Sequence, residues 1–533
     1  MVASPHSLAS AAGLSILRRG GSAVDAAIAT AAVLGTVYPH MTGIGGDGFW
    51  LVHDPRSPRT RGLNASGPAA RLASVALYRS LSDGRRIPER GPNSALTVPG
   101  AVDGWRAAHE RFGRLAWDEL LADAIRYAEE GAPVGRSLGR WMAAHASRLH
   151  AHPDAARVFL PGKRPPREGE RLAQPALAAT LRLIARDGAR AFYEGALPER
   201  ICDALAACGS PLRAGDFAAY AAEWVEPIAS AYRGLLVQEM PPNTQGLSAL
   251  LILGMLEGFD VAAWGDDSAD YYHHLAEAAR LASADRDAWC ADPRFSAAPL
   301  RELLDPRYAA ERGRRIDPAA ALPASAIAPG LAHAPPARAA RVGGDTCYVA
   351  VVDADGMVVS MIESLYLDFG SCVMAGDTGV LLQNRGALFS LREEDANVLH
   401  PGKRPFHTII PALALRDGAP WLAFGSMGGN GQPQTHAALV TRLVDFGYDV
   451  QRAIEAPRWV MGRTLTSADE RLWLEGRVSR AAVRELRRRG HPVRVLEDWS
   501  EAMGHAQAIR IHCDTGLLEG GADPRGDGAA VGY

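Results

Sequence analysis

The chain has 533 residues, of which 47% are hydrophobic and 22% are charged, and its formal net charge at pH 7 is −3. These are ordinary globular values, so we expect a large buried core and exclude wholesale disorder. Because acidic and basic side chains nearly cancel, the composition argues against a nucleic-acid-binding or membrane-surface protein. At about 100–200 residues per domain, the length allows two to four domains or one large intertwined α/β unit.

The six cysteines have neither the spacing of a zinc motif nor that of a Cys-x-x-Cys redox pair. We therefore expect reduced, mostly buried thiols, and the sequence implies no metal and no cofactor. The first residues lack a basic start followed by an apolar run, so no secretion signal is expected. The longest apolar stretch, residues 26–37, is shorter than the roughly 20 residues that span a bilayer. A cytoplasmic enzyme is expected, with the possibility of a late start and a missing upstream export signal left open.

The first half of the chain is mainly helical in pattern. Residues 14–17 lead through two arginines to two glycines that end a first helix, and residues 23–37 predict a second, buried helix. The glycine-rich run at 43–48 precedes an apolar strand at 49–53. It lacks the Lys-Ser/Thr of a phosphate loop, so close backbone packing is the better interpretation. Residues 271–289 predict a long core helix with an acid–base cluster near its end.

The pattern changes between residues 314 and 346. Residues 314–345 are dominated by Ala, Pro and Gly, which predicts an exposed, mobile linker. Residues 346–353 then form an apolar run typical of a strand that is covered on both faces, and 357–362 return as a second strand after a turn signal. The mixture of helices and strands predicts an α/β protein in which helices cover stacked sheets.

Thr346 stands where the linker ends and the strand begins. A threonine hydroxyl needs a neighbouring base to act as a nucleophile, and an N-terminal threonine supplies one in its own α-amino group. With an unperturbed pKa of about 7.7–8.0, that amine is available near neutral pH. Inside an uncut chain the same nitrogen is an amide, so this chemistry requires cleavage of the Asp345–Thr346 bond. Taken alone, Thr346 is more simply explained as a good strand former.

The segment 344–356, GDTCYVAVVDADG, resembles the processing site and small-subunit start of the γ-glutamyltransferase family. The resemblance covers nearly the whole chain in the same order, including GGSAVDAA at 20–27, GIGGDGF at 43–49, TVPGAV at 97–102, HLAEAAR at 274–280, PGKRP at 401–405, GSMGG at 425–429 and DPR at 523–525. It implies an N-terminal-nucleophile hydrolase with a four-layer αββα fold, made from one self-cleaved precursor. The large subunit would be residues 1–345 and the small, catalytic subunit residues 346–533.

The resemblance also implies roles for three residues besides Thr346. The backbone N–H groups of Gly428 and Gly429 would form the oxyanion hole, which suits a pair without side chains. Ser364 corresponds to the hydroxyl residue that orients the amino group of the nucleophile. Without the resemblance, a tight turn and a solvent-facing strand serine would be the simpler interpretations.

The chain departs from the γ-glutamyl pattern where the substrate's α-carboxylate and α-ammonium would bind. Arg385 stands in place of a glutamine or glutamate, Leu388 in place of an aspartate, Tyr366 in place of an asparagine, and His407-Thr408 in place of a serine pair. An ammonium beside Arg385 would be buried without a partner, whereas a carboxylate would be paired there. We therefore expect Arg385, Tyr366, His407 and Thr408 to bind an acyl group that carries a carboxylate. A structural ion pair is the alternative for Arg385.

One branch of the family fits this expectation. The segments YPHM at 38–41, QNRG at 383–386 and APRWVMGR at 456–463 resemble those of bacterial oxamate amidohydrolases. We rank hydrolysis of small, oxamate-like amides first. An authentic γ-glutamyltransferase or glutathione hydrolase, an acylase for dicarboxylic acyl groups of the cephalosporin type, and an inactive binding homologue are the alternatives. The expected partners are the small amide and the two subunits of one precursor, with a dimer of these heterodimers left open.

Overall fold

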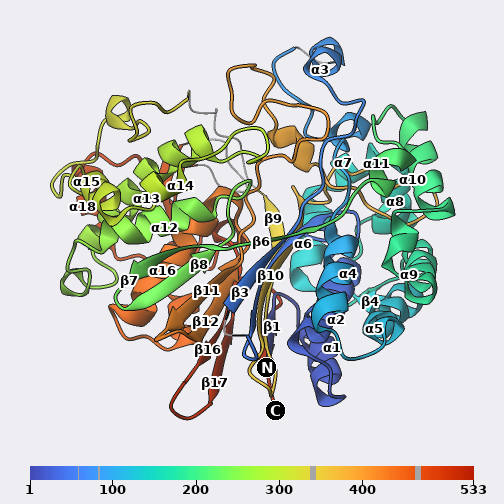
Figure 1. Ribbon diagram of the computed structural model, residues 1–533, viewed down its shortest axis with the longest axis horizontal. Helices are drawn as coiled ribbons and strands as arrows, with labels where there is room; N and C mark the ends of the chain where they lie inside the picture. Colours follow the sequence, from blue (N-terminus) through green and yellow to red (C-terminus); the bar gives the residue numbers. More distant parts are fainter. Residues whose placement is uncertain (58, 82–83, 336–343, 463–469) are drawn as a thin grey trace.

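The computed structural model describes the chain except for residues 58, 82–83, 336–343 and 463–469 (Figure 1). Two stacked sheets occupy the middle of the molecule, and a group of helices covers each outer side. This arrangement confirms the expected four-layer αββα fold. Among the described residues, no helix is long and apolar enough to cross a membrane.

The first sheet has seven antiparallel strands and is built around the predicted hairpin at Thr346. Its order is β18 (Ala529–Val531), β1 (Val2–Ser4), β9 (Asp345–Val352), β10 (Val358–Tyr366), β2 (Asp47–Asp54), β3 (Arg59–Ala65) and β6 (Glu223–Val225). Strands that precede residue 346 therefore lie on both sides of β9 and β10. The two expected subunits share this sheet and cannot be separated as two compact domains.

The second sheet has six strands, all antiparallel. Its order is β17 (Leu518–Ala522), β16 (Ala506–Ile511), β12 (Ala419–Ser426), β11 (Ala412–Arg416), β8 (Leu235–Glu239) and β7 (Ile228–Tyr232). A layer of buried apolar side chains fills the space between the sheets, including Phe49, Tyr348, Ile362, Leu413 and Ile509. The sheets approach closely at Gly425, where an added Cβ would lie 2.3 Å from the ring of Tyr348.

Helices α1 (Ser7–Arg18), α2 (Ala23–Val37), α4 (Ala101–Phe112) and α5 (Trp117–Glu130) cover the seven-stranded sheet, on the blue side of Figure 1. The predicted buried helix at 23–37 is thus confirmed. It begins at a capping box in which Ser22 and Asp25 each accept a backbone N–H of the other. The N–H of Ala23 also donates to Asp353 in the turn between β9 and β10, at 2.9 Å. This bond fixes the helix against the hairpin.

Helices α12 (Gly246–Leu256), α13 (Ala269–Trp289) and α16 (Gln432–Val444) cover the six-stranded sheet on the opposite side (Figure 1). The predicted core helix at 271–289 is confirmed as α13. The remaining helices are α3 (Val75–Leu81), α6 (Arg136–Ala144), α7 (Ala146–His150), α8 (Pro153–Phe159), α9 (Pro175–Asp187), α10 (Ala196–Ala207), α11 (Ala214–Ala218), α14 (Leu300–Leu303), α15 (Pro306–Gly313), α17 (Val450–Glu455) and α18 (Arg480–Arg488).

Smaller elements complete the fold. A three-stranded sheet contains β13 (Trp459–Gly462), β14 (Arg471–Leu474) and β15 (Val493–Val495), and a two-stranded one contains β4 (Ala132–Pro133) and β5 (Arg171–Leu172). Short 3₁₀ turns lie at η1 (Pro92–Ser94), η2 (Pro161–Lys163), η3 (Ala189–Phe192), η4 (Ala262–Trp264), η5 (Ala324–Ala326), η6 (Arg385–Leu388), η7 (Gly429–Gly431) and η8 (Glu501–Met503).

The segment expected to be a mobile linker falls only partly within the described residues, because 336–343 lie outside them. Its first part, residues 314–335, makes specific hydrogen bonds to α13. The N–H of Leu322 donates to Glu277 at 2.8 Å, and the N–H of Gly330 donates to Asp285 at 2.7 Å. This part of the linker is therefore attached to the helical layer.

Candidate functional site

Thr346 on β9, Ser364 on β10 and Asp47 on β2 form a row across three neighbouring strands. Ser364 pairs with Asp47, while the β9–β10 register shifts between Glu363, opposite Cys347, and Tyr366, opposite Asp345. This irregularity places Ser364 beside Thr346. Because alternate strand residues share a face and Tyr348 belongs to the layer between the sheets, Thr346 also faces that layer. Its side chain is buried, and its Oγ1 has no hydrogen-bond partner among the described residues.

Ser364 is fully buried rather than facing solvent. Its Oγ accepts hydrogen bonds from the backbone N–H of Tyr366, at 2.8 Å, and from the Nη2 of Arg385, at 3.0 Å. The backbone at Tyr366 has a φ of +83°, in a region that residues other than glycine rarely adopt. The turn after Ser364 therefore brings a backbone donor back onto its hydroxyl and fixes the hydroxyl's position.

Arg385 has no solvent exposure. Its Nη1 donates to Oγ1 of Thr408 at 2.9 Å, and its guanidinium carbon lies 4.5 Å from the ring centroid of Tyr366. Among the side chains that the structure describes, no carboxylate lies within ion-pair distance of this guanidinium, and its Nε makes no hydrogen bond. Burial lowers the pKa of Arg385 to about 10, against the raising effects of nearby Tyr366 and Asp47. The group stays a cation at neutral pH.

His407 and Asp47 form a second buried pair beside this cation. The Nε2 of His407 lies 3.1 Å from Oδ2 of Asp47, although neither ring nitrogen makes a well-aligned hydrogen bond to a described residue. The other oxygen of Asp47 accepts from the N–H groups of Gly67 and Gly100, both at 3.0 Å. Burial raises the pKa of Asp47 to about 7 and lowers that of His407 well below its usual value, so we expect a neutral imidazole.

Gly428 and Gly429 follow the end of β12, a strand that contacts both β9 and β10 of the first sheet. Both have positive φ values, +136° and +55°, which glycine adopts without strain. The side-chain Nε2 of Gln245 donates to the carbonyls of both Gly429, at 2.7 Å, and Thr408, at 2.5 Å. Gln245 therefore holds the glycine pair and the Arg385 site at a fixed relative position.

The chain that enters Thr346 passes through this space. A Cβ added to Gly344 would lie 3.2 Å from Oγ1 of Thr408 and 3.3 Å from the Cα of Gly429. Gly344 thus lies against the glycine pair and the hydroxyl to which Arg385 donates. In the uncut chain it occupies part of the space that a substrate would need.

The structure brings together all the residues singled out from the sequence: Thr346, Ser364, Tyr366, Arg385, His407, Thr408, Gly428 and Gly429, with the backbone of Asp345 on the strand between them. Sequence reasoning missed Asp47 and Gln245. Asp47 could have been noticed as a lone acid between glycines that lead into an apolar strand.

Glu363 was also missed. It points to the opposite face from Ser364, accepts hydrogen bonds from Thr42 and Trp105, and has its pKa raised to about 8 by burial. We infer that it is a protonated structural acid. Within the described parts of the chain, no group of three or more His, Cys, Asp or Glu side chains is arranged to hold a metal ion.

Comparisons with known proteins agree over the full length. The family model described as Gamma-glutamyltranspeptidase matches residues 9–533. The chain is 45% identical over 532 residues to the glutathione hydrolase-like YwrD proenzyme of Bacillus subtilis, covering 100% of this chain and 98% of that protein. It is 44% identical over 538 residues to the oxamate amidohydrolase proenzyme of Klebsiella pneumoniae, with coverage of 100% and 98%.

A solved structure shows the same architecture. The crystal structure of a cephalosporin acylase from Bacillus halodurans superposes with a TM-score of 0.91 and 37% identity, covering 100% of this chain and 95% of that one. Sequence, family model and fold therefore agree with the geometry around Thr346. The chain belongs to the γ-glutamyltransferase (gamma-glutamyltranspeptidase) family and is a hydrolase or transferase of the N-terminal-nucleophile type.

Proposed function

We propose that this protein is a self-cleaving amidohydrolase that acts on small amides whose acyl group carries a carboxylate, with oxamate as the model substrate. Cleavage of the Asp345–Thr346 bond would yield subunits 1–345 and 346–533. The new amine of Thr346 is the base, and the carboxylate of the substrate binds at Arg385.

The reaction follows from the arrangement of the row and the glycine pair. The α-amine of Thr346 takes the proton of the hydroxyl, whose oxygen attacks the amide carbon. The N–H groups of Gly428 and Gly429 stabilise the negative oxygen that develops, and loss of one such donor typically costs about 10²–10³ in rate. The amine product leaves with the proton from the Thr346 ammonium. Water then cleaves the Thr346 ester and releases the acid. Ser364, held by Tyr366 and Arg385, orients the amine.

The observation that carries the proposal is the fully buried guanidinium of Arg385, which has no ion-pair partner among the described side chains. An isolated buried charge is costly, and a substrate carboxylate would pair with it and recover that cost. Arg385 also donates to Ser364, the hydroxyl beside Thr346. A carboxylate bound here would therefore lie close to the amide that is attacked, which favours a short acyl group.

An ammonium group would be disfavoured in the same position. The cation of Arg385 would repel it, and the buried side chains closest in sequence, Ala387 and Leu388, offer no negative charge. The similarity to an oxamate amidohydrolase supports this preference, because oxamate has a carboxylate and no ammonium. The similarity to a glutathione hydrolase-like proenzyme makes γ-glutamyl amides the competing class to test.

The mechanism is tested by denaturing electrophoresis and N-terminal sequencing of the purified protein. We expect two bands, with Thr346 at the start of the smaller one. The variant Thr346→Ala should remain a single chain without amidase activity. An active enzyme that retains the Asp345–Thr346 bond would refute the mechanism.

The substrate class is tested by comparing kcat/KM for oxamate with that for a γ-glutamyl anilide. We expect oxamate to be preferred at least tenfold. The reverse preference would refute the proposed class and favour a glutathione hydrolase.

A further inference from the structure

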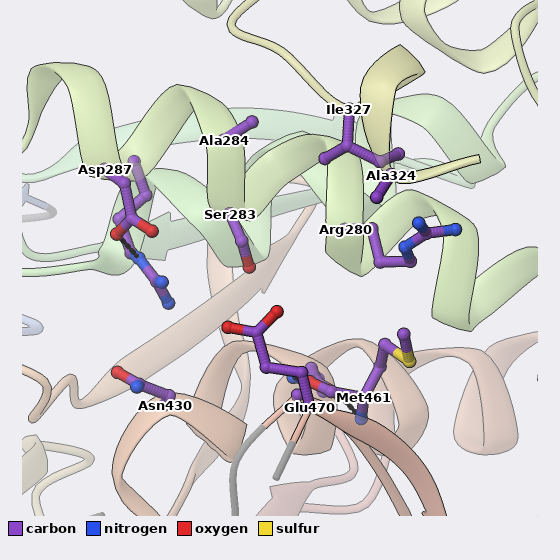
Figure 2. A pocket seen from close by; sticks show the side chains of 12 residues that line it. Arg280, Ser283, Ala284, Asp287, Ala324, Ile327, Asn430, Met461 and Glu470 are labelled. Carbon is purple, nitrogen blue, oxygen red and sulfur yellow. Dashed lines mark hydrogen bonds and ion pairs between the residues drawn. The ribbon is translucent and has the colours of Figure 1, made fainter. Parts of the chain in front are cut away.

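A cavity of about 320 Å³ lies beside the glycine pair, between the large-subunit helix α13 and the small-subunit strand β13 (Figure 2). Arg280, Ser283, Ala284 and Arg286 line it from α13. Across the cavity, the carboxylate of Glu470 points toward Ser283 in Figure 2. Asn430 contributes to the floor and directly follows Gly429 in the chain.

The cavity is connected to the reaction site through hydrogen bonds. Arg286 donates to the side-chain oxygen of Gln245 at 3.1 Å, and the amide nitrogen of Gln245 donates to the carbonyl of Gly429 at 2.7 Å. Gln245 also binds the carbonyl of Thr408 at 2.5 Å. The same side chain thus joins the acyl-binding residue Thr408, the glycine pair and the wall of the cavity.

The acyl-binding residues are not part of this cavity. The described residues that line it do not include Arg385, Tyr366, His407 or Thr408. A scissile amide at Gly429 would have its carboxylate side at Arg385. Its nitrogen side is then free to extend toward Asn430.

The outer wall of the cavity comes from the linker that precedes the cleavage site. Ala324 and Ile327 line the cavity from this segment. Both ends of the segment are fixed to α13, since Leu322 bonds to Glu277 and Arg280, and Gly330 bonds to Asp285. These anchors do not involve the Asp345–Thr346 bond, so cleavage leaves them intact.

We propose that this cavity binds the amine half of the amide substrate, and that Ala284 and Ile327 set the largest amine that fits. The inference rests on the proposed function, because it assigns the leaving-group side of the same site. The volume of about 320 Å³ is many times the roughly 10–15 Å³ that a single water molecule needs, and so is far more than ammonia requires. The substrates are therefore N-substituted amides as well as primary ones.

The lining also indicates the chemical class of the amine. Each of the two arginines in the lining already has an acidic partner, since Arg280 pairs with Glu277 and Arg286 pairs with Asp287. Ile327 and Met461 add apolar surface. A neutral amine with an apolar body fits this lining, whereas a multiply charged amine would leave one of its charges unpaired.

The test is a series of oxamates with the same acyl group and amines of increasing size, from oxamate through N-methyl and N-butyl to N-phenyl oxamate. The mature wild type should hydrolyse N-phenyl oxamate with a kcat/KM within tenfold of that for oxamate. Ala284→Phe fills the cavity and should lower kcat/KM for the N-phenyl compound at least tenfold, with oxamate changed less than twofold. Ile327→Ala should raise the N-phenyl value about threefold.

Ala185→Phe, in a surface groove over α9, is the matched control and should change neither value. Self-cleavage of each variant reports correct folding. If Ala284→Phe does not fold, the inference is tested by Ile327→Ala alone, which should raise kcat/KM for N-phenyl oxamate. Equal effects on small and large amines, or no effect of either variant, would overturn the inference. If oxamates are not substrates, the proposed acyl class is wrong, and the same amine series on γ-glutamyl amides still tests the cavity.

Discussion

Two buried arginines of this protein, Arg385 and Arg525, have opposite environments. Both are among the largest fully buried side chains of the chain. Arg525 forms a bidentate ion pair with Glu475, with both hydrogen bonds at 2.6 Å, and donates to Asp523 at 3.0 Å. Arg385 bonds only to two hydroxyls and a tyrosine ring among the described side chains.

Their pKa values differ accordingly. Interactions with Asp523 and Glu475 raise the pKa of Arg525 above its ordinary value despite its burial. Burial lowers the pKa of Arg385, because nearby groups compensate only in part. Arg525 is neutralised by ion pairs within the protein, whereas the charge of Arg385 is compensated only in part by the described side chains. This difference indicates a structural role for the first and a ligand-binding role for the second.

The largest expected effect on stability follows removal of the paired arginine. Arg525→Met leaves the buried Glu475 without its bidentate partner and removes one of the two arginines that pair with Asp523. This should cost about 3–5 kcal/mol of unfolding free energy. Urea denaturation of the mature protein measures this loss. A change below about 1 kcal/mol would show that the buried cluster is not structural.

The unpaired arginine should respond in the opposite way. Arg385→Met removes the proposed partner of the substrate carboxylate, so we expect kcat/KM for oxamate to fall about 10²–10³-fold. Its unfolding free energy should change by no more than about 1 kcal/mol, because no buried acid among the described residues forms an ion pair with Arg385. Measured side by side, the two variants are controls for each other. Loss of stability without loss of activity in Arg385→Met would reverse our assignment.

The sequence predicted the elements of this site better than their arrangement. Helix α2, helix α13 and the hairpin after Thr346 follow from apolar periodicity and turn signals, which act over short distances. The pairing of Asp47 with Ser364 joins strands far apart in the chain, and no local pattern encodes it. The β9–β10 register shift beside Thr346 and the attachment of residues 314–335 to α13 likewise depend on tertiary contacts.

The chemistry of Arg385 shows the same limit. The sequence alone showed that a positive charge replaces the family's glutamine or glutamate at position 385, and this charge predicted a carboxylate partner. Whether that partner comes from the protein or from a substrate depended on the surrounding side chains. Only the structure shows that Thr408 and Ser364, two neutral hydroxyls, occupy the two ends of the guanidinium.

A ligand that supplies the missing charge should stabilise the mature protein. At about 100 times its dissociation constant, a small dicarboxylate such as oxalate should add about 2.7 kcal/mol to the unfolding free energy. Thermal unfolding with increasing oxalate measures this shift. The shift should be absent in Arg385→Met, and ethylenediamine, a small dication, should give none in the wild type. Stabilisation of both proteins by oxalate would place the anion elsewhere.

The smallest effect is expected when the charge is kept and its geometry is changed. Arg385→Lys retains a cation but replaces a planar fork with a single ammonium, so we expect about a tenfold loss in kcat/KM for oxamate. The two terminal nitrogens of Arg385 reach hydroxyls on different segments, Ser364 on β10 and Thr408 before β11, and one ammonium is poorly placed to hold both and a substrate carboxylate. Whether this loss comes from KM or from kcat then identifies which interaction of Arg385 the reaction depends on. A rise in KM alone means that Arg385 acts through the carboxylate. A fall in kcat with a shifted pH profile means that Ser364, released from Arg385, no longer holds the amine of Thr346 in place.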